Sequence, residues 1–106
     1  MIIRVFRARI RPGHNAEFEA LLREVSIPLV ARQDGLLACY VGRPIGANGD
    51  EFTMVSVWRD LEALQAFTGD AWERPVIPDE REAAVILESF AHHSEGFWAL
   101  PGLSSE

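Results

Sequence analysis

The sequence of 106 residues predicts an α+β domain whose elements follow in the order β-α-β-β-α-β. Two apolar stripes with three- and four-residue spacing indicate amphipathic helices. Four segments rich in β-branched and aromatic residues indicate strands, and clusters of glycine and proline separate them. This order is the split βαβ, or ferredoxin-like, arrangement, in which a four-stranded antiparallel sheet carries both helices on one face.

The first strand and the first helix are predicted in the N-terminal third of the chain. The strand covers residues 2–11, and a Pro-Gly pair ends it. Asn15 is expected to cap the helix, because its side chain accepts hydrogen bonds from free backbone N–H groups. The apolar stripe of this helix consists of Phe18, Leu21, Leu22, Val25 and Leu29. Pro28 interrupts the stripe and is expected to kink or shorten the last turns before Gly35 ends the helix.

The rest of the chain supplies the other elements. The three remaining strands are predicted at residues 36–43, 52–58 and 83–92. The first two are expected to form a hairpin around a polar turn at residues 44–50. Asp60 is expected to cap a short helix that Gly69 ends. Residues 70–79 hold two prolines and are predicted to be irregular.

The composition predicts one small domain that pairs with a second copy. We expect a domain over residues 1–97 and a C-terminal tail over residues 98–106. The hydrophobic content of 48% is high for a chain this short, which buries only a limited fraction of its surface by itself. Apolar residues occupy both alternating faces of the strands, so the helix-free face needs a cover. The sequence therefore predicts a homodimer, two sheets face to face in a dimeric α+β barrel.

Charge and hydropathy exclude several classes of function. The net charge of −6 argues against a nucleic-acid partner, because phosphate contacts need clustered basic residues. The chain has neither a signal-peptide pattern nor a run of about 18 apolar residues, so no membrane association is expected. Cys39 is the only cysteine, which precludes an internal disulfide. The expected compartment is the cytoplasm.

Two adjacent histidines near the end of the last strand are candidate functional residues. Consecutive strand residues point to opposite faces of a sheet, so His92 and His93 are not expected to ligate one metal ion. The chain also lacks the ligand spacings of common metal sites. One of the two is expected to face the helices, where it would act as an acid, a base or a hydrogen-bond donor. The alternative is a strand-end histidine bonded to backbone or water.

Other candidate residues each have a structural interpretation beside the functional one. Trp58 ends a strand and is expected to fill the corner before the next helix. Trp72 lies in the irregular segment, where it would line a pocket or hold the loop on the core. Cys39 is interpreted as a small core residue. The glycine-rich segment 42–49 lies between two strands and does not match a nucleotide-binding loop.

Three stretches of the sequence resemble one protein family. The runs FTMVSVWRDLEALQAF (52–67), WERPVIPDE (72–80) and HHSEGF (92–97) are similar to the antibiotic biosynthesis monooxygenase family. The resemblance implies a dimeric α+β barrel with a pocket between helices and sheet in each subunit. Some members oxygenate polycyclic phenols or quinols with O₂ and need neither metal nor flavin, whereas others degrade haem.

The haem-degrading branch has residues that this chain lacks. That branch uses an Asn on the first strand, and a Trp and a His in or after the second helix. When the chain is aligned on Trp58, the positions of that Asn, Trp and His are occupied by Arg7, Phe67 and Ile77. No motif therefore supports haem or flavin, and no cofactor is expected.

We therefore expect a cofactor-independent monooxygenase acting on a small hydrophobic or aromatic molecule. In this hypothesis Arg7 stabilises an anion, and His92 or His93 accepts a proton. Two alternatives remain: a non-catalytic small-molecule-binding or stress-related barrel, and a haem-binding protein. The residues expected to line the substrate pocket are Tyr40, Trp58, Phe67 and Trp72.

Overall fold

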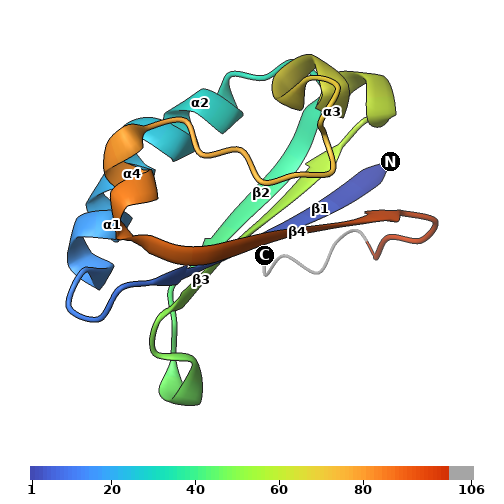
Figure 1. The fold of residues 1–106 in the computed structure, drawn as a ribbon. Coiled ribbons are helices and arrows are strands. Elements are labelled where there is room, and N and C mark those ends of the chain that lie inside the picture. Colours follow the sequence, from blue (N-terminus) through green and yellow to red (C-terminus); the bar gives the residue numbers. More distant parts are fainter. Residues whose placement is uncertain (101–106) are drawn as a thin grey trace.

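The computed structural model describes residues 1–100 and has the predicted α+β, ferredoxin-like architecture (Figure 1). Four antiparallel strands form one sheet in the order β2-β3-β1-β4, which places β1 at the centre between β3 and β4. The helices lie on one face of this sheet, and we call the other the helix-free face. The strands are β1 (Ile2–Ile10), β2 (Leu36–Gly42), β3 (Glu51–Trp58) and β4 (Ile86–Glu95). Residues 101–106 of the expected tail lie outside the described residues.

The first predicted helix contains an irregular turn at its centre. It consists of α1 (Asn15–Leu21), a π-helical turn η1 (Leu22–Ser26) and α2 (Ile27–Ala31). Pro28 has no backbone N–H, and the wider π turn before it absorbs the missing helical bond. The extra residue also shifts the inward face of the helix. Ser26 is therefore buried, whereas Val25 in the predicted stripe is only partly covered.

The predicted cap of α1 is wrong. His14 is the N-cap residue and makes no capping bond through its side chain, while Asn15 begins the helix. The Asn15 amide instead donates to the backbone oxygen of Gly49, at 2.7 Å, in the turn between β2 and β3. That turn includes the short 3₁₀ helix η2 (Gly46–Asn48). The side chain that was expected to cap the helix thus ties its start to the hairpin.

The second half of the chain contains one helix that was not predicted. In α3 (Leu61–Thr68), Asp60 accepts the backbone N–H of Ala63 at 2.8 Å, as expected of its cap. The segment expected to begin the last strand is helical instead, and forms α4 (Glu80–Val85). Asp79 caps it by accepting the backbone N–H of Arg81 at 2.8 Å. The fourth strand consequently starts three residues later than expected and continues past His92.

The core consists of two apolar clusters between the helices and the sheet. One cluster gathers around Phe18 and Phe52, whose rings meet edge to face at 5.1 Å. The other gathers around Trp58, which is fully buried and stacks on Phe67 with ring centroids 5.4 Å apart. Met54 packs against both clusters. Trp58 therefore fills the strand-to-helix corner, as its position in the sequence predicts.

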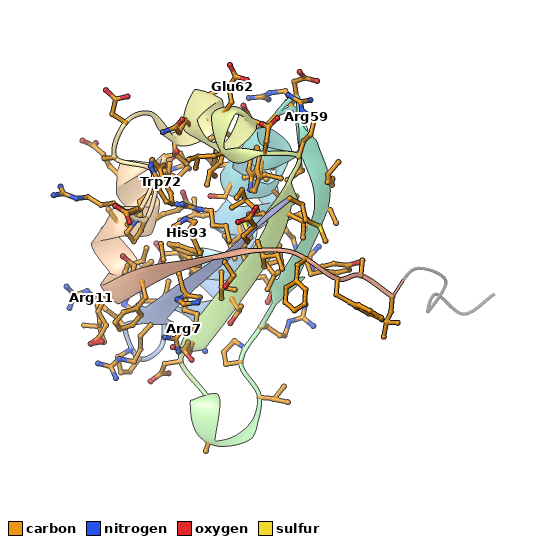
Figure 2. The ribbon with its side chains drawn as sticks, turned by 90° about the vertical axis from the view of Figure 1, so that its right-hand side faces the viewer. Arg7, Arg11, Arg59, Glu62, Trp72 and His93 are labelled. Atoms are coloured by element: carbon orange, nitrogen blue, oxygen red, sulfur yellow. The ribbon has the colours of Figure 1, made fainter. Side chains whose placement is uncertain are left out.

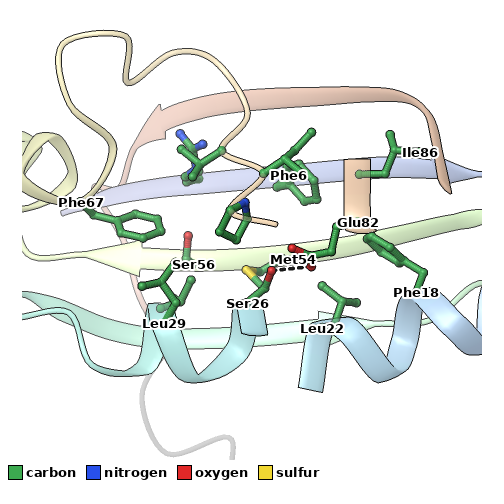
Figure 3. A pocket seen from close by; sticks show the side chains of 15 residues that line it. Phe6, Phe18, Leu22, Ser26, Leu29, Met54, Ser56, Phe67, Glu82 and Ile86 are labelled. Atoms are coloured by element: carbon green, nitrogen blue, oxygen red, sulfur yellow. Dashed lines mark hydrogen bonds between the residues drawn. The ribbon is translucent and has the colours of Figure 1, made fainter. Parts of the chain in front are cut away.

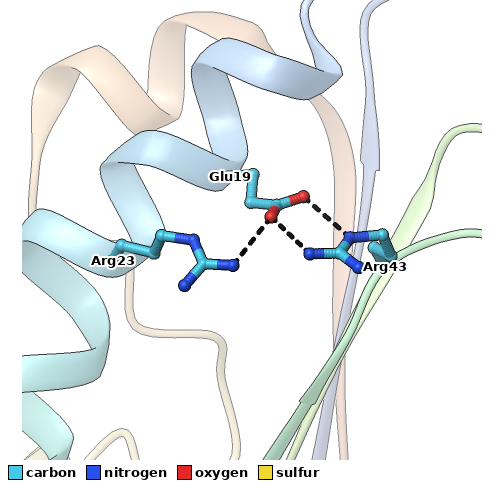
Figure 4. Close-up of polar contacts among 3 residues, drawn as sticks. All are labelled: Glu19, Arg23 and Arg43. Atoms are coloured by element: carbon cyan, nitrogen blue, oxygen red, sulfur yellow. Dashed lines mark hydrogen bonds and ion pairs between the residues drawn. The ribbon is translucent and has the colours of Figure 1, made fainter.

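A surface ion-pair group ties α1 to the end of β2 (Figure 4). The Glu19 carboxylate accepts from Nε and Nη2 of Arg43 at 3.0 and 2.6 Å, and from Nη2 of Arg23 at 3.1 Å. Mainly the bonds from Arg43, and then the one from Arg23, lower the pKa of Glu19 to about 2. Any stabilisation from this depressed pKa is present above the ordinary carboxyl pKa and is lost as the pH falls towards 2. Because the group is exposed, its contribution is small.

Gly35 is a point at which only glycine fits. Its backbone φ is +89°, and a Cβ atom there would lie 2.5 Å from the Cβ of Ala63 in α3. Gly35→Ala is expected to lower the free energy of unfolding by roughly 2–3 kcal/mol, because backbone strain and a steric clash add. Gly13→Ala has a similar φ of +85° but meets nothing within 4 Å. It should cost only about 1 kcal/mol. If urea unfolding shows the same loss of unfolding free energy for both variants, the predicted clash with Ala63 is contradicted.

Candidate functional site

A cavity lies between the helix layer and the sheet (Figure 3). Its volume is about 40 Å³, which is room for about three water molecules. Members of both core clusters line it, including Phe18 and Val30, and Val76, Ile77 and Pro78 of the segment before α4 contribute to its wall. The lining is mostly apolar. Its polar members are Arg4, Ser26, Ser56 and Glu82.

Arg4 is a buried cation in the wall of this cavity. Its side chain is on β1, and the residue is 4% exposed. Nη1 donates to the backbone oxygen of Trp72 and to Nε2 of His93, both at 2.7 Å, and Nη2 donates to the backbone oxygen of Arg74 at 2.9 Å. A guanidinium has five N–H groups, so two remain without an acceptor among residues 1–100. Burial lowers the pKa of Arg4, but a guanidinium stays protonated in proteins.

These bonds fix the state of His93. Because a guanidinium only donates, Nε2 of His93 must accept, and the neutral ring carries its proton on Nδ1. Burial first, and then the charge of Arg4, lowers the pKa of His93. The ring also meets the Trp72 ring edge to face, with centroids 4.9 Å apart. We call these three residues, Arg4, Trp72 and His93, the Arg4 cluster.

A second polar pair faces the same cavity from the helix layer. Glu82 on α4 is 2% exposed, and its Oε2 accepts a hydrogen bond from the Ser26 hydroxyl at 2.6 Å (Figure 3). Its Oε1 is buried and has no hydrogen-bond partner among the described residues. Burial raises the pKa of Glu82, and the bond from Ser26 offsets this only in part. Burial thus shifts Glu82 towards its uncharged form.

Three expected site residues lie on the helix-free face. The register pairs His92 with Val5, and Arg7 with Phe90, all on the face away from the cavity. Nη1 of Arg7 lies 3.6 Å from Oε2 of Glu51, and the guanidinium carbon of Arg7 lies 5.2 Å from the centre of the Phe90 ring. Tyr40 is 70% exposed on the same face. The predicted contacts of Arg7 and Tyr40 with the cavity are wrong, because strand side chains alternate between the two faces. The same alternation makes His92 the histidine that faces away from the helices.

The other expected residues lie on the helix side. His93 and Trp72 belong to the Arg4 cluster (Figure 2), so one of the two histidines faces the helices, as expected. Phe67 lines the cavity, whereas Trp58 is buried behind it and does not. The Trp72 ring lies on His93, and its backbone oxygen holds Arg4. Of these four residues Phe67 alone is in the lining, and Trp72 and His93 are linked to the cavity through Arg4.

Sequence reasoning missed the polar groups that the cavity contains. Arg4 alternates in step with the apolar Phe6 and Ala8, so the sequence already places its side chain on the same face of the first strand as theirs. Glu82 follows Asp79 by three residues, the spacing of a helix-capping pair. Nothing in the sequence predicted that Ser26 lines the cavity, because in a regular helix without the π turn its side chain would not point to the centre of the buried face.

Residues 1–100 contain no group of three or more His, Cys, Asp or Glu side chains placed to hold a metal ion. None of the helices in this range is long and apolar enough to cross a membrane.

The chain is similar to known proteins in sequence family and in fold. The family model described as antibiotic biosynthesis monooxygenase matches residues 1–71. No curated protein matches the chain in sequence. Among solved structures, SnoaB, a cofactor-independent oxygenase from Streptomyces nogalater, has a TM-score of 0.71 at 19% identity, covering 94% of this chain and 96% of SnoaB.

Two further structures share the fold. PA3566 from Pseudomonas aeruginosa has a TM-score of 0.67 at 17% identity, covering 92% of this chain and 94% of that protein. A variant of MhuD with two manganese protoporphyrin IX molecules bound per active site has a TM-score of 0.69 at 20% identity. That match covers 96% of this chain and 100% of the MhuD variant. At these identities the likeness shows the architecture alone.

Proposed function

The chain belongs to the antibiotic biosynthesis monooxygenase family, and on that basis we propose that it is a cofactor-independent monooxygenase for a small aromatic or quinol-like compound. The observation that carries the proposal is Arg4, a buried cation in the wall of a mostly apolar cavity, with two N–H groups that have no acceptor among residues 1–100. A phenolate is the form of such a compound that reacts with O₂. A preorganised cation in a dry site stabilises it more strongly than water does.

The proposed reaction balances without a cofactor. A phenol with a ring C–H reacts with O₂ to give a quinone and water. One oxygen atom forms the new C=O bond, and the other leaves as water with the hydrogens of the former O–H and C–H bonds. All electrons come from the substrate, so the protein must bind the ring, favour the phenolate and exclude water. Phe6, Met54 and Phe67 supply apolar contact surface for the ring.

Ligand entry requires a change in the cavity wall. A volume of about 40 Å³ does not admit an aromatic ring, since a cavity of about 150 Å³ is known to bind benzene. The irregular segment at residues 76–78 is the part of the wall that lacks helix or strand bonding. We propose that it moves outward when a substrate binds.

The donor set of the cavity does not fit a haem. Of the side chains that usually ligate haem iron, only Met54 is in the lining that the structure describes. Nε2 of His93 already accepts a hydrogen bond from Arg4. Ile77 lines the cavity at the position where the haem-degrading branch has its histidine.

We also propose a homodimer through the helix-free face. The register places Tyr40, Val55, Val5 and His92 side by side in one row across the sheet. Phe90 adds a second aromatic ring that is 41% exposed in the single chain. Exposed aromatic side chains on a sheet face without helices are typical of an interface between copies of a chain.

Arg4→Met is expected to lower the rate of O₂ uptake with phenols or quinols by roughly 100-fold, because the charge that stabilises the phenolate is lost. Arg7→Met, on the opposite face, should leave the rate unchanged. O₂ uptake and incorporation of labelled oxygen into the product measure both. The absorbance of the bound phenolate gives a second readout: its pKa should be lower in the wild type than in Arg4→Met.

Arg4→Lys distinguishes loss of charge from loss of structure. It keeps the positive charge, so part of the lowering of the pKa of the bound phenol should remain. A normal rate and phenolate shift in Arg4→Met would contradict the proposed role. Binding without any O₂ uptake by the wild type would support the alternative of a non-catalytic binding barrel.

Sedimentation tests the dimer. The wild type should sediment at twice the chain mass of 11.8 kDa. Replacing Tyr40 and Phe90 together by Asp should give the single-chain mass, because each interface would then bury like charges. Both side chains are exposed in the single chain, so the fold should survive. Ala16→Asp, an exposed change in the first turn of α1, is the matched control and should remain dimeric.

A further inference from the structure

Glu82 is a buried acid for which the fold supplies only half of the hydrogen bonds. Ser26 satisfies Oε2 at 2.6 Å, while Oε1 is buried without a partner among the described residues. The neighbouring Arg81 does not neutralise it, because its guanidinium binds Asp79 at 2.8 and 3.1 Å. A buried polar atom without a partner costs free energy, so such atoms call for an explanation beyond stability.

The position of Glu82 supplies that explanation. Glu82 and Ser26 both line the cavity that Arg4 lines, but they belong to the helix layer, whereas Arg4 belongs to the sheet. The rest of the lining is mostly apolar, with Phe6 and Met54 facing the same space (Figure 3). A ligand in this cavity thus meets a cation on one wall and a carboxyl group on another.

The Ser26 bond also indicates where the proton of an uncharged Glu82 is. A carboxylic acid accepts hydrogen bonds better through its carbonyl oxygen than through its hydroxyl oxygen. Oε2 accepts from Ser26 and therefore has carbonyl character, which leaves the hydroxyl at Oε1. Oε1 is then a donor without an acceptor among residues 1–100, and a ligand oxygen is the acceptor that it lacks.

We propose that Glu82 is a specificity-determining residue whose Oε1 hydrogen-bonds a second oxygen of the ligand, so that the cavity selects dihydric phenols or quinols over monohydric phenols. The Arg4 cluster takes the ionised oxygen, and the Ser26–Glu82 pair takes the other. This inference rests on the proposed use of the cavity as the substrate site and narrows its substrate class.

The test compares binding of hydroquinone and phenol under argon, so that no oxidation takes place. Calorimetry on the wild type should show hydroquinone binding about tenfold more tightly, as one added hydrogen bond implies. Glu82→Met removes both polar oxygens at similar length, and the two probes should then bind equally. Glu80→Gln, an exposed change in the same helix, is the matched control and should keep the tenfold preference.

Infrared spectroscopy provides a readout that does not depend on Glu82→Met folding. The protonated-carboxyl band that is absent in Glu82→Gln belongs to Glu82. In the wild type it should shift when hydroquinone binds and stay in place when phenol binds. A preference that survives in Glu82→Met, equal binding of both probes by the wild type, binding of neither, or an unshifted band would each overturn the inference.

The same experiments separate this inference from the proposed function. Selective anaerobic binding without O₂ uptake in air would contradict the monooxygenase and leave the role of Glu82 intact. O₂ uptake with equal rates for both probes and with no effect of Glu82→Met would contradict only the role of Glu82.

Discussion

The site depends on one interaction, the burial of the Arg4 guanidinium among neutral hydrogen-bond acceptors. Burying a cation is costly unless its N–H groups are satisfied. Here two backbone oxygens of the segment after α3, those of Trp72 and Arg74, and the ring of His93 on β4 satisfy three of them. The same bonds hold that irregular segment against the sheet, and its continuation at residues 76–78 closes the cavity. The position of the wall and the charge inside it therefore have a single cause.

The sequence predicted the fold well because the strong signals are local. Asp60 caps α3 through its own side chain, and Trp58 fills the corner next to it. The site residues were harder to predict from the sequence, because the site depends on which face of each strand the helices cover. Arg7 was selected by residue type, although the apolar Phe6 and its even-numbered neighbours mark the covered face and thereby select Arg4. Alternation separates His92 from His93, but only the pairing of β4 with β1 places His93 opposite Arg4.

The apolar periodicity of the sequence could not predict the two site residues in the helix layer, Ser26 and Glu82. The helix α4 has six residues, too few to show an apolar repeat, and only the pair Asp79 and Glu82 signals its start. Ser26 faces inward because the π turn adds a residue before it, and a single Pro28 is weak evidence for such a turn. Two small departures from regular structure thus bring a hydroxyl and a carboxyl together across 56 positions of sequence.

The electrostatics of the cavity follow from how these groups affect one another. Burial favours the uncharged form of both His93 and Glu82, lowering the pKa of the first and raising that of the second. Arg4 keeps its proton, so the cavity wall carries a buried positive charge. In a buried, mostly apolar wall that charge acts at a lower dielectric constant than on the surface. Under the proposed function, the ionised oxygen of the substrate supplies the negative charge that pairs with Arg4, so acidic aromatic compounds would bind better than apolar molecules of the same shape.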